Sequence, residues 1–213
     1  MLNLSEIFFS IQGESTSAGL PCIFIRFAGC NLRCKYCDTK FSYETKFSLE
    51  TQEILQKIKK YYPVKLMEIT GGEPLLQNEV YDLIESFHKE NFKILLETNG
   101  SISMKLVPQY VIKIVDVKCP GSGYEDSFLK ENLKYIDSKK DEIKFVLSDR
   151  NDFDWAKDFI RKFNLENYKI IFSAVFEKLD SKTLAQWILA DKLKVRMQLQ
   201  MQKYIWGKDR RGV

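Results

Sequence analysis

The sequence lacks the features of several common classes of protein. No apolar run approaches the roughly 20 residues of a membrane-spanning helix, so we expect a soluble chain. No charged and then apolar leader opens it, and no repeat, linker or low-complexity segment divides it, which favours a single domain over residues 1–213. A chain of this length buries about 70% of its unfolded surface, so it needs no disulfide bonds to fold.

Histidine is nearly absent, and cysteine is present in an odd number. The 5 cysteines cannot all pair, so we expect free thiols in a reducing cytoplasm. The only histidine, His88, falls on the polar side of a predicted helix, and neither Cys22 nor Cys119 has a partner at metal-ligand spacing. A structural zinc site would therefore lack an obvious fourth ligand.

The excess of basic residues is small. The net charge is +4 and the sequence pI is about 8.6, which favours anionic ligands in general without indicating nucleic acid. Lys208, Arg210 and Arg211 form a basic cluster that could contact RNA or could simply be solvated. Because no RNA-binding module accompanies the cluster, solvation is favoured, and we expect neither nucleic-acid nor membrane binding.

Three cysteines lie close together directly after the apolar segment 22–27. Cys30, Cys34 and Cys37 fall within eight residues, so one short loop can direct three thiolates at one centre. Soft thiolates bind zinc, copper(I) or iron–sulfur clusters. Three ligands leave one iron of a [4Fe–4S] cluster open to bind a small molecule, and we favour this interpretation. A zinc knuckle or three buried core cysteines are the alternatives.

Apolar, β-branched segments alternate with segments of helical period. The strand candidates are 22–27, 65–70, 93–97, 111–117, 143–147 and 169–174, and the clearest helix candidates are 50–60, 78–89 and 152–163. Nearly continuous apolar strands that are each followed by a helix predict a parallel α/β sheet of six units. Because an eight-unit barrel typically needs about 250 residues, we expect an incomplete, laterally open (β/α)6 barrel.

Polar residues and glycines follow several of these strands. Gly71, Gly72 and Glu73 follow the second strand, Glu97 ends the third, and Lys118 follows the fourth. Parallel sheets bind ligands at the carboxyl ends of their strands, so these residues should meet the cysteine loop at one rim. The glycines permit positive φ and close approach to a ligand, whose polar atoms their N–H and C=O groups can bind. An ordinary turn at the glycines, and a capping or surface role for Glu97, are the alternatives.

A charged residue interrupts the first predicted strand. Arg26 lies between Ile25 and Phe27, where a buried cation needs a partner. A bound carboxylate would pair with it in a bidentate manner, and a protein acid such as Glu14 is an equally good partner.

The cysteine motif resembles the signature of a known superfamily. Its C-x3-C-x2-C spacing, with Tyr36 before the last cysteine, is similar to that of the radical S-adenosylmethionine (SAM) superfamily. Further stretches narrow the resemblance to the 7-carboxy-7-deazaguanine synthase family, from about residue 6 to the C-terminus. They are Ser-Ile-Gln-Gly-Glu at 10–14, Asp-Thr at 38–39, Gly-Gly-Glu-Pro at 71–74, Glu-Thr-Asn-Gly at 97–100, Asp-Val-Lys at 116–118 and Leu-Gln at 199–200.

The resemblance implies a reaction and its cofactors. Such an enzyme contracts 6-carboxy-5,6,7,8-tetrahydropterin to 7-carboxy-7-deazaguanine with loss of ammonia, on the route to queuosine and related deazapurines. In the superfamily the open iron binds SAM, which one electron cleaves to a 5′-deoxyadenosyl radical. The family also implies a Mg2+ ion, a homodimer, and flavodoxin or ferredoxin as the electron donor.

The resemblance also implies residue roles, position by position. The [4Fe–4S] cluster would be bound by Cys30, Cys34 and Cys37, and Mg2+ by Thr39. SAM would be bound by Tyr36, Gly71, Gly72, Glu73, Glu97, Lys118 and Ser148. The pterin would be bound by Gln12, Gly13, Glu14, Arg26, Gly72 and Gln202.

Two positions depart from the family pattern. Relatives usually carry glycine where this chain has Ser15, and commonly carry histidine where it has Gln202. Glutamine donates and accepts hydrogen bonds but cannot titrate. Because hydrogen abstraction by a radical needs no histidine proton, we expect activity to be retained.

Two other functions compete with this interpretation. One is an activase of the same superfamily that generates a glycyl radical on a partner protein. The other is a noncatalytic zinc module whose basic cluster contacts RNA. Metal analysis would separate the module, with about one zinc and no sulfide, from an iron–sulfur enzyme.

Overall fold

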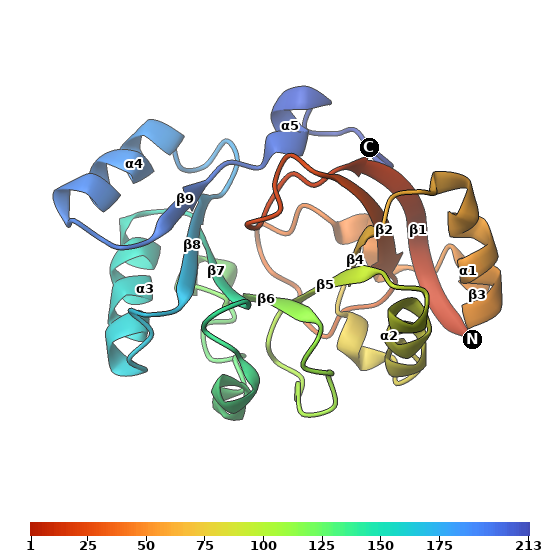
Figure 1. The fold of residues 1–213 in the computed structure, drawn as a ribbon. Helices are drawn as coiled ribbons and strands as arrows, with labels where there is room; N and C mark the ends of the chain where they lie inside the picture. Colours follow the sequence, from red (N-terminus) through yellow and green to blue (C-terminus); the bar gives the residue numbers. More distant parts are fainter.

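One nine-stranded sheet organises the computed structural model, which describes residues 1–213 (Figure 1). Its strands lie in the order β3-β1-β2-β4-β5-β6-β7-β8-β9. They are β1 (Leu2–Ile11), β2 (Pro21–Phe27), β3 (Phe47–Leu49), β4 (Leu66–Gly71), β5 (Lys93–Thr98), β6 (Ile112–Asp116), β7 (Glu142–Leu147), β8 (Lys169–Ala174) and β9 (Arg196–Gln198). Neighbours from β2 to β9 are parallel, whereas β1 is antiparallel to β2 and β3. Because β3 and β9 remain edges, the curved sheet is a partial barrel.

All six predicted strands are confirmed, each to within one residue at either end, as β2 and β4 to β8. The prediction that each strand is followed by a helix is wrong for two of them. β5 and β6 lead onward through loops and 3₁₀ turns alone. Pro108 and Pro120, together with Gly121 and Gly123, interrupt these connections, and such residues end helices.

Helices cover the outer face of the sheet (Figure 1). They are α1 (Thr51–Ile58), α2 (Val80–Lys89), α3 (Arg150–Lys162) and α4 (Ser181–Ala190), and a short α5 (Met201–Ile205) lies beyond β9. The three predicted helices are confirmed as α1, α2 and α3. Side chains cap them at their starts: Asp149 accepts a hydrogen bond from the Asp152 N–H, and Asp180 accepts one from Thr183. A core of 39 buried residues fills the space between helices and sheet.

The inner face of the sheet has two layers. Six buried residues form an apolar floor: Phe8, Cys22, Phe24, Leu66, Leu95 and Ile114. Successive side chains of a strand alternate between faces, so the next inward residue of each strand lies two positions nearer its carboxyl end. From β2 to β6 these residues are Arg26, Glu68, Glu97 and Asp116. The apolar floor therefore carries a charged layer that faces the carboxyl rim.

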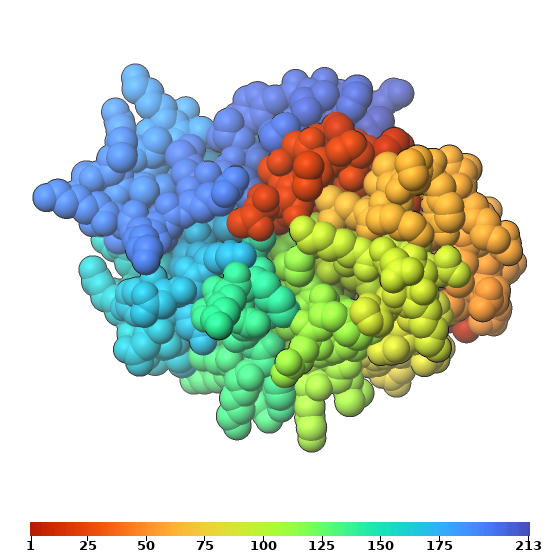
Figure 2. Space-filling view, viewed as in Figure 1, coloured from red at the N-terminus to blue at the C-terminus, as the bar shows by residue number.

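The loop between β1 and β2 crosses the inside of the curved sheet. Thr16, in this loop, donates hydrogen bonds from its N–H and its hydroxyl to the buried Glu142 carboxylate on β7. In the space-filling view the N-terminal segment lies between the C-terminal segment and the segments around β4 and α2 (Figure 2). The loop thus joins the two halves of the partial barrel.

The elements that the sequence analysis did not assign are β1, β3, β9, α4 and α5. β3 and β9 have three residues each, too few for periodicity to show. None of the helices combines the length and the apolar character needed to cross a lipid bilayer.

Candidate functional site

A cavity of about 650 Å³ opens at the carboxyl rim of the parallel strands. Fourteen of the predicted site residues line it: Gln12, Gly13, Glu14, Arg26, Cys30, Cys34, Tyr36, Cys37, Thr39, Gly71, Gly72, Glu97, Lys118 and Gln202. Only Glu73 and Ser148 do not. Residues from both ends of the sequence and from four consecutive strands are therefore brought to one site.

The three clustered cysteines border this cavity as free thiols. Cys34 is buried, whereas Cys30 and Cys37 are half-buried. Burial raises the pKa of Cys30 and of Cys34. No three side chains of the His, Cys, Asp and Glu types lie close enough to share one metal ion. In a [4Fe–4S] cluster each cysteine thiolate binds a different iron.

The cluster loop is tied to its surroundings. The Tyr36 hydroxyl donates to the Val146 carbonyl on β7 at 2.9 Å, and the Lys35 N–H donates to Ser122 at 3.1 Å. The Leu32 N–H points at the Cys30 sulfur at 3.4 Å. Cys22 and Cys119 are fully buried elsewhere.

The two glycines after β4 pack against the cluster loop. A Cβ atom on Gly71 would lie 2.2 Å from the Phe27 carbonyl oxygen, and one on Gly72 would lie 1.9 Å from that of Gly29. The Gly72 N–H donates to Phe27 and the Glu73 N–H donates to Gly29, so the expectation of free N–H groups here is wrong. The Gly72 carbonyl makes no hydrogen bond within the backbone and remains available to a ligand.

Glu73 is fully buried, and its side chain does not reach the cavity. It accepts hydrogen bonds from the N–H groups of Leu75 and Asn99 and from the Thr98 hydroxyl. Burial raises its pKa to about 7, although these hydrogen bonds act in the opposite direction. We therefore revise its expected role from binding SAM to fixing the rim loops after β4 and β5.

Ser148 is also occupied within the protein. Its N–H and its hydroxyl both donate to Asp152, each at 2.7 Å, and Asp152 accepts a further bond from the Gly121 N–H. The side chain lies outside the cavity, so its expected contact with SAM is revised to a role in holding the loop after β6 against α3.

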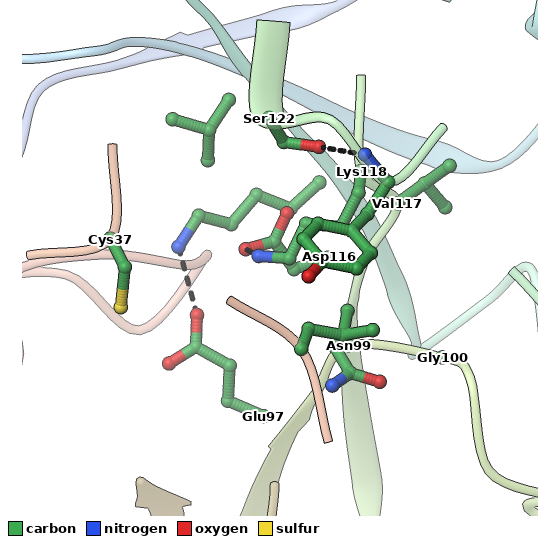
Figure 3. Close-up of polar contacts among 12 residues, drawn as sticks. Cys37, Glu97, Asn99, Gly100, Asp116, Val117, Lys118 and Ser122 are labelled. Atoms are coloured by element: carbon green, nitrogen blue, oxygen red, sulfur yellow. Dashed lines mark hydrogen bonds and ion pairs between the residues drawn. The ribbon is translucent and has the colours of Figure 1, made fainter. Parts of the chain in front are cut away.

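Lys144, on β7, links two predicted site carboxylates and was missed by the sequence analysis. Its ammonium group lies 2.5 Å from Glu14 and 2.8 Å from Glu97, and the second contact is the dashed line that ends on Glu97 in Figure 3. Burial alone would lower the pKa of Lys144, but these carboxylates raise it well above its ordinary value. Thr70 also donates to Glu97, at 3.0 Å, so that carboxylate is held from two sides.

Lys118 follows β6 and pairs with Asp116 at 2.7 Å, in the group of residues around the rim (Figure 3). Burial would lower the pKa of Lys118, but Asp116 and the Cys34 thiol raise it. A fixed positive charge therefore lies beside the cysteine loop.

Arg26 pairs with Glu6 at 2.7 Å, not with Glu14. Only its Nε makes this contact, so both terminal NH2 groups remain free for a ligand. The guanidinium also lies over the rings of Phe8 and Phe41, at 5.7 and 5.8 Å from their centroids.

Helix α5 closes the cavity over the N-terminal motif. Gln202 donates to Glu14 at 2.9 Å, while its Oε1 atom is buried without a partner. A Cβ atom on Gly13 would lie 1.9 Å from this oxygen, so a larger residue there would displace the Gln202 side chain. Lys203 pairs at 2.7 Å with Asp38, the residue before Thr39. The closing segment is thus linked directly to the cluster loop.

The Gln12 side chain is directed into the protein. Its oxygen accepts from the Glu14 N–H at 3.0 Å, and its amide N–H donates to Glu68. Glu68 lines the cavity and was also missed. A signal existed: Glu68 and Lys144 are charges within apolar strands, as Arg26 is, but only the register shows that all three face inward.

Comparison with known proteins gives concordant results. The model of the radical SAM superfamily matches residues 24–180. A 7-carboxy-7-deazaguanine synthase of Koribacter versatilis is 43% identical over 100% of both chains, and one of Chlorobaculum tepidum is 41% identical over 100% of this chain and 97% of its own. The crystal structure of QueE from Escherichia coli shares the fold with a TM-score of 0.73 at 24% identity, covering 92% of this chain and 93% of that one.

Proposed function

The chain belongs to the radical SAM superfamily and, within it, to the 7-carboxy-7-deazaguanine synthases, and from this premise we propose that the cavity described above holds cluster, cofactor and substrate together. It is a carbon–nitrogen lyase of queuosine biosynthesis that uses a [4Fe–4S] cluster and SAM and acts on a pterin. The observation that carries the proposal is that the three cysteines, the glycine pair and the charged layer line the same cavity.

Cys30, Cys34 and Cys37 would hold the cluster, which together with SAM supplies the radical that begins the reaction. The Gly72 carbonyl, which faces no backbone donor, would accept from the amino group of SAM. Glu97 would bind its ribose hydroxyls, because Thr70 and Lys144 already hold that carboxylate in place. Tyr36, Lys118 and Gly71 would complete the wall around the cofactor.

Arg26 would bind the substrate carboxylate through its two free NH2 groups, which offer the parallel donors that a carboxylate accepts. The Thr39 hydroxyl would give an oxygen ligand to Mg2+ beside that carboxylate, as suits a hard cation that keeps several waters. Gln12, Gly13 and Glu14, which line the cavity, would position the ring.

Gln202 would serve where relatives commonly carry histidine. Its N–H group fixes Glu14, which lines the cavity, and its buried oxygen packs against Gly13. Neither task needs a titrating group, so we expect activity with glutamine here. A Gln202→His variant faster by more than about a hundredfold, roughly 2.7 kcal/mol in barrier, would contradict this.

We propose further that the chain is a single domain, forms a homodimer, and receives its electron from a flavodoxin or ferredoxin in a reducing cytoplasm. The 5 free thiols suit a reducing compartment. Tyr204, Ile205 and Trp206 are exposed on and beside α5 and could be covered in a dimer.

The test is an anaerobic assay of cluster-reconstituted protein with SAM, Mg2+, a reductant and 6-carboxytetrahydropterin, following product mass and ammonia. We expect 7-carboxy-7-deazaguanine, about four irons and four sulfides per chain, and loss of both cluster and product in Cys34→Ala. Cys119→Ala, which removes a buried thiol outside the cavity, is the matched control and should keep the cluster.

Other outcomes would be decisive in different ways. Formation of 5′-deoxyadenosine without the product would keep the radical chemistry and reject the substrate. One zinc without sulfide would favour a noncatalytic module instead.

A further inference from the structure

Glu68 is a buried carboxyl group in the floor of the substrate cavity, and no role described so far uses it. It is the deepest member of the charged layer, since on β4 it lies level with Phe24 and Leu95 of the apolar floor. It is 4% exposed and lines the cavity. In the parallel register Phe24 lies opposite Glu68 and Arg26 lies opposite Thr70. Glu68 is therefore two residues, roughly 7 Å, deeper in the barrel than the rim level of Arg26.

The two oxygens of Glu68 have different surroundings. Oε2 accepts the Gln12 side-chain N–H, whereas Oε1 has no hydrogen-bond partner in the protein. Oε1 is not among the side-chain atoms that are sealed from solvent without a partner. Because the rest of the residue is buried, the only solvent that Oε1 can meet is in the cavity. A free acceptor therefore points into the cavity.

The ionised carboxylate of Glu68 lacks the hydrogen bonds that would stabilise it in a buried site, because only Oε2 has a donor. Burial and the neighbouring Glu97 and Glu14 raise the pKa of Glu68 well above its ordinary value, and Lys144 and Arg26 offset this only in part. The group beneath it, Cys22, is a buried thiol whose own pKa is raised by burial and by Glu68. No protein donor serves Oε1, so an N–H group from the ligand would supply the missing partner.

We propose that Glu68 is a specificity-determining residue whose Oε1 accepts a hydrogen bond from the 2-amino group of the substrate's pyrimidine ring. This rests on the proposed function, in which a pterin occupies the cavity. The positions of Arg26 and Glu68 suit such a ligand. Arg26, at the rim, would bind the carboxylate, and Glu68, on the floor, would bind the edge of the ring that carries the 2-amino group. Glu68 would thus distinguish a 2-amino from a 2-oxo ring, as buried polar groups do when an analogue leaves them unpaired.

A matched pair of ligands tests this directly. 6-Carboxypterin carries an amino group at ring position 2, where 6-carboxylumazine carries an oxo group. Their dissociation constants would be measured by fluorescence on anaerobic, cluster-reconstituted protein with SAM and no reductant, so the readout is binding without turnover. We expect wild type to prefer the pterin by at least about tenfold.

Glu68→Gln should reverse or abolish that preference. The Gln12 N–H needs an acceptor, so the new amide would turn its oxygen to Gln12 and present its NH2 group to the cavity. The NH2 group of the glutamine would meet a 2-amino group unfavourably, because both groups are donors. It would donate a hydrogen bond to a 2-oxo group. Glu97→Gln is the control: it removes another carboxylate from the same cavity and should weaken SAM binding while the pterin preference persists.

The outcomes are separable. Unchanged preference in Glu68→Gln would overturn the proposal, and so would an equal loss of affinity for both ligands, which would show that Glu68 only holds Gln12. Normal SAM affinity in Glu68→Gln verifies that the variant is folded. If wild type binds neither ligand, the pterin assignment itself fails, and the inference about Glu68 fails with it.

Discussion

Ser15 occupies a backbone conformation that favours glycine. Its φ is 66°, in the left-handed region that costs most residues roughly 1–2 kcal/mol. Its hydroxyl accepts from the Ser17 N–H at 3.0 Å, which offsets part of this cost and explains how the chain tolerates serine where relatives usually have glycine.

Ser15 provides a pair of variants with different expected stabilities. Ser15→Ala keeps the strain and leaves the Ser17 N–H without its acceptor, so it should destabilise by roughly 1–2 kcal/mol. Ser15→Gly loses the same hydrogen bond but relieves the strain, so it should stay within about 1 kcal/mol of wild type. Urea denaturation of the cluster-free protein measures both, and equal losses would contradict the strain argument.

Glu73 makes stability depend on pH. Burial raises its pKa from the ordinary 4.5 to about 7, so the folded state holds this proton more tightly than the unfolded chain. Its contribution is fully present below pH 4.5 and is lost as pH rises through 7. The lost contribution is about 3 kcal/mol, by the conversion of pKa shifts to free energy.

Glu73→Gln removes this titration while keeping the size of the side chain. The unfolding free energy of wild type minus that of the variant should therefore fall by about 3 kcal/mol between pH 4.5 and 7.5. Denaturation at a series of pH values measures the difference, and a difference that stays constant or rises would reject the raised pKa.

At the scale of elements, the turn after β4 and the cluster loop form one packed unit. In Gly72→Ala the new Cβ would lie 1.9 Å from the Gly29 carbonyl oxygen, so the cluster loop must move. We expect the iron retained after reconstitution to fall by more than half. Gly19→Ala is the control, since Gly19 has a φ of +92° but nothing within 4 Å, and it should bind iron normally despite losing roughly 1–2 kcal/mol of stability.

An element could be predicted from the sequence when its pattern of apolar residues is complete within one segment. The parallel strands are buried on both sides for much of their length, so their apolar runs stand out, and so do the amphipathic helices. Edge strands β3 and β9 leave no such pattern. The loops after β5 and β6 resemble no element because proline and glycine interrupt them.

Site residues could be predicted from the sequence where they belong to a motif, but not where only the fold brings them together. The cysteines and the glycine pair are consecutive in sequence, and the structure brings them to one cavity. Lys144 and Glu68 belong to the site through strand register alone, since each contacts residues far away in the sequence. Conversely, Glu73 lies in a motif and Ser148 follows the fifth predicted strand, yet the N–H of Asn99 holds the Glu73 side chain, and the Asp152 carboxylate holds that of Ser148, away from the cavity.

At the scale of the whole molecule, the contact between Thr16 and Glu142 joins the two halves of the sheet. Glu142 is 1% exposed and accepts from both donors of Thr16, so Glu142→Gln should destabilise the protein by about 1–3 kcal/mol. Thr16→Val removes only the hydroxyl. In a double-mutant cycle by urea denaturation the two losses should overlap by at least about 0.5 kcal/mol, and strict additivity would show that the hydroxyl bond to Glu142 contributes nothing.

Because the barrel never closes, the sheet keeps two free edges, and such edges are templates on which other chains can add strands and aggregate. Both edge strands, β3 and β9, are only three residues long. β9 also begins with the exposed Arg196, a charge of the kind that discourages pairing between chains. The barrel can therefore stay open at one side without offering other chains a long edge to which strands could be added.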